Sequence, residues 1–156
     1  MFAKRVAMGL SVVWCVSVLF LAGCGGQKTY KDTVKKTLHK AVQLEQKGER
    51  EKALELYNSV VEKHPDDKQG FMYRAMFYAN NKQNDKALTD YLKVMELDPE
   101  EFYCAQQIAY LAREKGDKAM AKKYDTIAME NQQKQMEKNR DYIEQEKAKK
   151  SSKKRK

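Results

Sequence analysis

The chain is poor in the residues that build reactive sites and in those that interrupt helices. Its 156 residues include 3 cysteines, 2 histidines, 7 glycines and 2 prolines. Neither His39 nor His64 stands at metal-ligand spacing from another histidine or a cysteine, so no zinc site is expected. The sequence also lacks a glycine-rich phosphate loop, a G-x-S-x-G nucleophile turn and an H-E-x-x-H motif. We therefore expect no metal, no cofactor and no enzymatic activity.

Scarce glycine and proline, together with abundant alanine, leucine, lysine, glutamate and glutamine, indicate an all-α protein. The spacing of apolar residues and of turn residues predicts helices over residues 31–46, 49–64, 67–80, 84–97 and 100–115, with a last helix from about residue 117. Gly48 is expected to end the first helix. In the turn at residues 80–82, asparagine is expected to supply the same left-handed geometry.

The helical residues repeat at an offset of thirty-four positions. The recurring residues of the first unit are Ala41, Ala53, Tyr57, Val60 and Pro65, and those of the second are Ala75, Ala87, Tyr91, Val94 and Pro99. A period near 34 is typical of stacked helical hairpins. Small residues let two helices approach closely, and a neighbouring large residue fills the space behind them.

These positions resemble the tetratricopeptide repeat family over about residues 34–127. The family's glycine is present as Gly48 and Gly116, and the second repeat lacks it. The third repeat departs further, because its aromatic, Tyr124, falls one residue short of the period and no proline follows. The resemblance implies an α-solenoid of about three hairpins, with a last helix that caps the array and continues beyond 25 residues.

The first residues predict export. Lys4 and Arg5 precede an apolar run at residues 6–22, which is typical of a secretory signal peptide; a retained membrane anchor is the alternative. Residues 21–24, Leu-Ala-Gly-Cys, resemble the bacterial lipobox. This resemblance implies cleavage before Cys24 and a covalent diacylglycerol, usually with an N-acyl chain such as palmitate.

Two or three acyl chains would anchor the mature protein firmly to a membrane without a spanning helix. Gly25 and Gly26 lack the aspartate that resembles an inner-membrane retention signal, so we expect the outer membrane, facing the periplasm, where the host has two membranes. Cys104 would remain as the one thiol of the mature chain. Its apolar helical surroundings favour a buried, structural role.

The excess positive charge lies at the end of the chain. Residues 147–156 contain seven basic groups and no acid, and they are predicted to be disordered. These basic groups form a candidate polyanion-binding tail: Lys147, Lys149, Lys150, Lys153, Lys154, Arg155 and Lys156. Export argues against nucleic acid as the partner, which leaves wall polymers or lipid phosphates, or a solvated tail without a specific partner.

The expected organisation is a signal peptide at 1–23, a lipidated linker at 24–30, repeats at 31–130, an exposed helical extension at 131–146 and the basic tail at 147–156. Met136 and Ile143, seven residues apart in the extension, are a candidate weak partner seam. No sequence feature predicts a strand or the oligomeric state.

In the repeat family, the first helices of the hairpins line a concave face. Helical spacing then predicts a peptide-binding groove formed by Leu38, Val42, Met72, Met76, Tyr103, Gln106 and Tyr110. Methionine and tyrosine suit an apolar peptide or an amphipathic helix. The alternative is that these residues pack on the long last helix.

Two functions are compatible with this reading of the sequence. The first is a membrane-anchored adaptor for protein partners in the bacterial cell envelope, in pilus, secretion or outer-membrane assembly. The second is a structural envelope protein whose basic tail binds wall polymers or lipid phosphates.

Overall fold

The computed structural model describes the backbone of residues 26–154 and the side chains of residues 30–150. Within this range the chain forms six α-helices and no strand. Their bounds are α1 Gly26–Gln46, α2 Arg50–Lys63, α3 Lys68–Asn80, α4 Asn84–Leu97, α5 Phe102–Glu114 and α6 Lys118–Lys154. The all-α prediction is confirmed. The helix α1 begins at Gly26, before the predicted start at residue 31, because no proline interrupts the residues between them.

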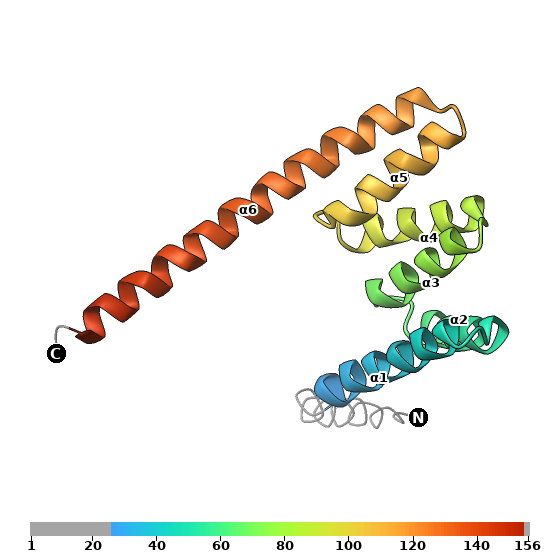
Figure 1. The fold of residues 1–156 in the computed structure, drawn as a ribbon, viewed down its shortest axis with the longest axis horizontal. Coiled ribbons are helices and arrows are strands. Elements are labelled where there is room, and N and C mark those ends of the chain that lie inside the picture. The colour runs from blue at the N-terminus through green and yellow to red at the C-terminus, as the bar shows by residue number, and fades with distance from the viewer. Residues whose placement is uncertain (1–25, 155–156) are drawn as a thin grey trace, which may run out of the picture. The chain divides into compact units, whose positions relative to one another are not determined.

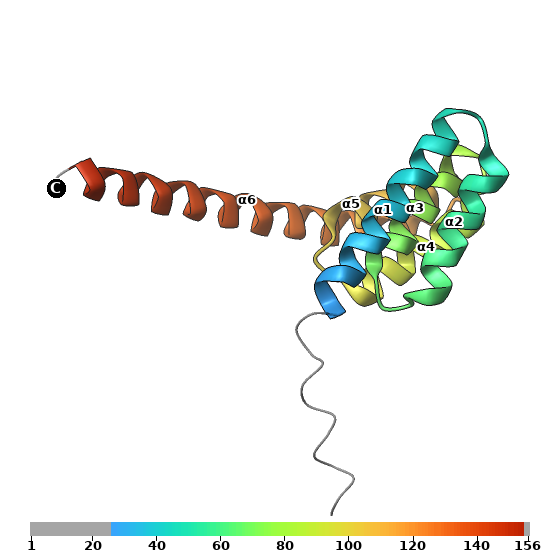
Figure 2. The same ribbon diagram turned by 90° about the horizontal axis from the view of Figure 1, so that it is seen from below.

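The chain divides into two compact units, Met1–Lys36 and Thr37–Lys156. Within the second unit, each helix from α2 to α5 packs against the next helix in the sequence. Figures 1 and 2 show α3 with α4 and α5 with α6 as antiparallel hairpins that lie side by side. This arrangement is the stack of hairpins that the repeat period predicts.

Alanine occupies the repeat positions where close packing of two helices requires a small side chain. The six alanines at these repeat positions are all buried: Ala41, Ala53, Ala75, Ala87, Ala109 and Ala121. Tyr57 and Tyr91, the predicted aromatics, are buried as well. Ala121 keeps the period in the third hairpin, although the aromatic and the proline after it do not. Close packing of helices therefore persists through all three units.

The three turns within hairpins share one backbone geometry. Gly48, Lys82 and Gly116 have φ values of 81°, 58° and 78°. The prediction for Gly48 is confirmed, but the prediction that asparagine would take the left-handed conformation in the second turn is wrong, since Asn81 has φ −97°. Lys82 stands at the glycine position of the period and adopts the conformation that the turn requires.

Arg74 of α3 forms an ion pair within the second hairpin and a hydrogen bond to the first. The Arg74 guanidinium donates two hydrogen bonds of 2.8 Å to the Asp90 carboxylate on α4 and one of 3.0 Å to the Asn58 side chain on α2. Hydrogen bonding to Asp90 raises the pKa of Arg74 despite its partial burial. Asp90 is only 4% exposed. Because each donor and acceptor is paired, this buried polar cluster fixes α3 relative to α2 and α4.

The last helix, α6, changes character along its 37 residues. Ala121, Ala128 and Asn131 are buried, and the Asn131 amide donates to the Pro99 carbonyl at 2.6 Å. Of residues 132–150, all are exposed except Glu146, which is half-buried. Figure 1 shows this part of α6 extending past the end of α5. The expectation of a single helix longer than 25 residues with an exposed second part is confirmed.

The structure differs from the sequence prediction in the basic tail. Helix α6 continues through Lys154, whereas residues 147–156 are predicted to be disordered. Alanine and lysine are strong helix formers, and no glycine or proline follows Gly116. Helix propensity therefore extends the helix despite the repulsion between like charges.

Cys104 is fully buried and makes no disulfide. Burial, with a smaller contribution from Glu101, raises the pKa of its thiol to about 12. The thiol is therefore protonated and behaves as a small apolar side chain, as expected. Among the described helices, none combines the length and hydropathy needed to cross a membrane.

Candidate functional site

A cavity of about 450 Å³ opens between α1, α2 and α3. Its apolar wall is formed by Val42 of α1 and by Tyr73 and Met76 of α3. The remaining lining residues are polar or carry a polar group: Glu45, Gln46, Arg50, Tyr57, Asn80 and Asn81. A concave site of this size, with an apolar wall and a few fixed polar groups, is typical of ligand and peptide pockets.

Helical periodicity brings these residues to one place. On α1, Val42 and Glu45 are three residues apart and so share a face of the helix. On α3, Tyr73, Met76 and Asn80 follow at intervals of three and four and present a second face. The closeness of α2 and α3 depends on Gly70, where an added Cβ would lie 2.9 Å from a Val60 methyl group.

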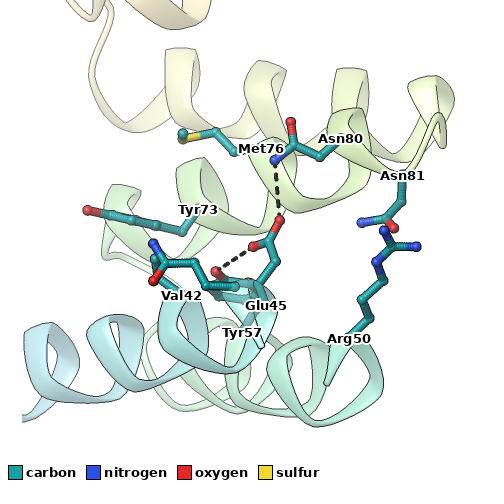
Figure 3. A pocket seen from close by; sticks show the side chains of 9 residues that line it. Val42, Glu45, Arg50, Tyr57, Tyr73, Met76, Asn80 and Asn81 are labelled. Atoms are coloured by element: carbon teal, nitrogen blue, oxygen red, sulfur yellow. Dashed lines mark hydrogen bonds between the residues drawn. The ribbon is translucent and has the colours of Figure 1, made fainter. Parts of the chain in front are cut away.

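Glu45 is the acidic centre of the cavity. Its Oε2 accepts a hydrogen bond of 3.2 Å from the Tyr57 hydroxyl, and its Oε1 accepts one of 3.2 Å from the Asn80 amide. Figure 3 shows the carboxylate between these two donors. One residue from each of the three helices thus contributes to a single polar cluster.

The tyrosine in this cluster is held in its neutral form. The Tyr57 ring is buried and packs against the Phe77 ring, with centroids 5.7 Å apart. Burial, and then the charge of Glu45, raises the pKa of the Tyr57 hydroxyl well above its usual value. Tyr57 therefore remains a hydrogen-bond donor to Glu45 throughout the physiological range.

The structure places only some of the predicted groove residues in this cavity. Val42 and Met76 line it, and Met72 is half-buried on the same helix as Met76. Leu38 is 3% exposed and lies in the core, where a ligand could not reach it without rearrangement. A buried leucine one turn before Val42 is explained by the width of the apolar face of α1.

The predicted residues of α5 lie outside the cavity. Tyr103 is half-buried and contacts the Tyr91 ring edge-on, with centroids 6.4 Å apart. Gln106 is exposed, and Tyr110 is 52% exposed. Of the predicted tail, Lys147, Lys149 and Lys150 are exposed on α6. The side chains of Lys153 and Lys154, and the whole of Arg155, Lys156 and Cys24, lie outside the described residues.

Two tyrosines and one arginine of the cavity were not among the predicted groove residues. Tyr57 was assigned only to the core, since the repeat pattern does not show that its hydroxyl reaches an open surface. Tyr73 lies one residue after Met72 and three before Met76, so a wider inward face on α3 would have included it. Arg50 enters from the start of α2, and no periodic signal marks that position.

A second cavity, of about 430 Å³, lies between α3 and α4. Its charged residues include Arg74 and Asp90, which are already bonded to each other. The described residues contain no cluster of three or more histidine, cysteine, aspartate or glutamate side chains able to hold a metal ion. The cavity around Glu45 is therefore the better candidate site.

The sequence of the first hairpin matches a known family. Residues 38–67 fit the family model for the tetratricopeptide repeat. The six helices show the same hairpin arrangement, with alanine at the close contacts of all three units. The chain therefore has a tetratricopeptide-repeat-like fold, and the family match itself covers the first hairpin. No curated protein sequence matches the chain significantly.

Solved structures of other tetratricopeptide-like proteins agree with this fold. The type III secretion chaperone SycD of Yersinia enterocolitica, in complex with a peptide of the translocator YopD, is 22% identical with a TM-score of 0.59. The alignment covers 64% of this chain and 76% of SycD. MamA from Desulfovibrio magneticus RS-1 is also 22% identical, with a TM-score of 0.57 and 70% of each chain covered.

A CopN–Scc3 complex supplies a third similar chain, which is 15% identical with a TM-score of 0.59. The alignment covers 67% of this chain and 64% of the other. At these identities the comparison establishes the shared fold. The details of the cavity around Glu45 belong to this chain.

Proposed function

We propose that this protein is a lipid-anchored adaptor of the bacterial cell envelope that binds a peptide segment of a protein partner in the cavity between α1, α2 and α3. The cavity itself carries the proposal, because it combines an apolar wall with a positioned carboxylate on the inner helices of a repeat array. Similar folds are recorded with a translocator peptide and in a CopN complex. In this proposal the cavity binds a peptide and carries out no reaction.

The anchor in this proposal is the diacylglycerol on Cys24, following export and removal of residues 1–23. The lipobox resemblance supports it. Mass spectrometry of the mature protein should find an N-terminal Cys24 carrying acyl chains, and Cys24→Ser should remain unprocessed. An unmodified thiol with the leader still attached would contradict the anchored, outer-membrane location.

Site-directed photo-crosslinking in intact cells tests the adaptor role. A photoreactive side chain at Tyr73, inside the cavity, should form a discrete adduct with one envelope protein. The same group at Glu55, an exposed α2 residue that does not line the cavity, serves as the control. The adduct should disappear when Met76→Glu is combined with the probe, because a charge on the apolar wall opposes peptide burial. Equal adducts from both positions would contradict the proposal.

The exposed basic end of α6 favours a second role. Lys147, Lys149 and Lys150 lie on a helix that extends past the repeats, and no acid follows Glu146. Such a segment would be attracted to wall polymers or lipid phosphates. Removal of residues 147–156 should then weaken envelope association in a salt-sensitive way, beyond the contribution of the lipid. Salt-insensitive association in both forms would contradict binding of a polyanion by the tail, and the adaptor role would be the one that remains.

A further inference from the structure

The carboxylate of Glu45 is held in place but is not neutralised. Both of its hydrogen-bond donors, the Tyr57 hydroxyl and the Asn80 amide, are uncharged. Within the described residues, Glu45 takes part in no ion pair. A negative charge that is fixed by two helices and faces an open cavity is an acceptor for a cation, and its binding would need little further ordering of the protein.

The wall around Glu45 suits a long side chain. Val42, Tyr73 and Met76 offer an aliphatic group, an aromatic ring and a thioether beside the carboxylate (Figure 3). Lysine and arginine bury their methylene stems along apolar surface while the charged end reaches a polar partner. An aromatic wall also favours a cation over a neutral group.

Arg50 is the one cationic residue that lines the cavity, and it does not occupy the space beside Glu45. Arg50 lies with Asn81 at the far side of the cavity from Tyr73, as Figure 3 shows, and its side chain is exposed. It makes no ion pair with Glu45. The cavity is therefore divided, with a hydrogen-bonded anion beside the apolar wall and an exposed cation on the rim.

We infer that the cavity recognises a lysine or arginine side chain of the partner segment, with its charge on Glu45 and a neighbouring apolar residue on Val42 and Met76. This inference rests on the proposed peptide-binding function and assigns its specificity. Charge complementarity selects a basic over an acidic or neutral residue at that position. The occupant is a peptide segment in which a basic residue adjoins apolar ones.

Selection from a random peptide library tests this assignment without a known partner. Full-length protein in detergent would be presented with phage-displayed 16-residue peptides, alongside Glu45→Gln and the matched control Glu51→Gln. Glu51 is an exposed acid on α2 that does not line the cavity. Peptides selected by the wild type and by the control should share one enriched lysine or arginine position, and those selected by Glu45→Gln should lack it. Thermal melting would show that each variant is folded.

A selected peptide then gives the quantitative test. Replacing its basic residue by norleucine, which keeps the stem and removes the charge, should weaken binding to the wild type about fivefold or more. The same replacement should change binding to Glu45→Gln less than twofold. Equal losses in both proteins would overturn the inference, as would selected peptides without a shared basic position.

The failure of this inference can be distinguished from failure of the proposed function. Peptides that lose binding to Met76→Glu but show no basic preference would retain the groove and overturn the role of Glu45. If no peptide binds the wild type, or if binding is insensitive to Met76→Glu, the cavity is not a peptide site and both proposals fall together.

Discussion

The two parts of α6 have the same backbone geometry but different support. Up to Asn131, the helix buries Ala121 and Ala128 within the third hairpin. Beyond it, residues 132–150 are exposed except for the half-buried Glu146, and the large apolar side chains Met136 and Ile143 lie 60% and 50% exposed. The first part is stabilised by packing, whereas the second depends on helix propensity and on exposed side-chain pairs, including the Lys138–Glu100 ion pair at 2.8 Å. A helix without a packed face is marginal in water, and an exposed ion pair adds little stability, so the two parts should respond differently to the same change.

This difference also separates the two proposed roles. The cavity around Glu45 needs three helices held at fixed distances. The packed repeats up to Asn131, called the body below, provide this. The basic end of α6 needs only a charged, extended segment, for which packing is unnecessary. Changes that loosen the body should therefore impair peptide binding and leave polyanion binding unchanged.

The largest expected effect concerns the buried ion pair of the body. Arg74→Met leaves the buried Asp90 carboxylate without its partner and should lower the free energy of unfolding by about 3 kcal/mol or more. Urea unfolding followed by circular dichroism measures it. Arg113→Met is the matched control, since it breaks a pair with Asp125 whose side chains are 53% and 43% exposed, and it should cost less than about 1 kcal/mol.

The double variant Arg74→Met with Asp90→Leu tests the reason for this effect. If the loss comes from an unpaired buried charge, removing the charge as well should restore much of the stability. A double variant as unstable as Arg74→Met would show that the lost packing around Arg74 matters more than the charge. Arg74 lies over the Phe71 and Tyr78 rings, so this outcome would have a structural explanation.

The next largest loss of stability is expected from a substitution at Asn131, where the two parts of α6 meet. Asn131→Asp keeps the side-chain shape but replaces the amide donor with a carboxylate facing the Pro99 carbonyl. A buried polar group left without its donor costs about 1–3 kcal/mol, so the variant should unfold at correspondingly lower urea. Gln132→Glu adds the same charge at an exposed neighbour and should have little effect. Equal effects would mean that charge, and not the hydrogen bond, governs the junction.

Much of the fold could be predicted from the sequence because the repeat constrains it. Alanine at fixed spacing, scarce glycine and two prolines locate every hairpin, and α4 has the predicted bounds Asn84–Leu97. The left-handed residue of the second turn was missed because lysine carries no such preference. The period alone, which aligns Lys82 with Gly48 and Gly116, contained that information.

The candidate site was harder to predict than the fold. Helical spacing identifies which face of α1 and α3 points inward, and it led to Val42 and Met76. It does not show how deep each position lies, so Leu38 was taken for a groove residue although it is buried. The roles of Tyr57 and Asn80 depend on hydrogen bonds between helices, which no single helix reveals.

Substitutions in the first and second turns should change the free energy of unfolding by smaller amounts and in opposite directions. Gly48→Ala should lower the free energy of unfolding by about 1 kcal/mol, because an added Cβ meets nothing within 4 Å and only the left-handed backbone is strained. Lys82→Gly removes that strain in the second turn and should stabilise by up to about 1 kcal/mol, reduced by the greater freedom of glycine in the unfolded chain. Thermal melting of each variant, compared with the wild type, measures the two changes in stability. The same sign for both would contradict a shared turn geometry.

The smallest expected change in stability comes from breaking the exposed part of α6. Gln145→Pro breaks the helix at an exposed position, where the carbonyl that the ring clashes with belongs to the exposed Asp141, so the free energy of unfolding of the body in urea should stay within about 0.5 kcal/mol of the wild type while helical circular dichroism decreases. Gln106→Pro makes the same substitution at an exposed position of α5, a helix packed against both α4 and α6, and should cost about 3 kcal/mol or more. A comparable loss from Gln145→Pro would mean that the extension stabilises the repeats, and the division of α6 at Asn131 would then be wrong.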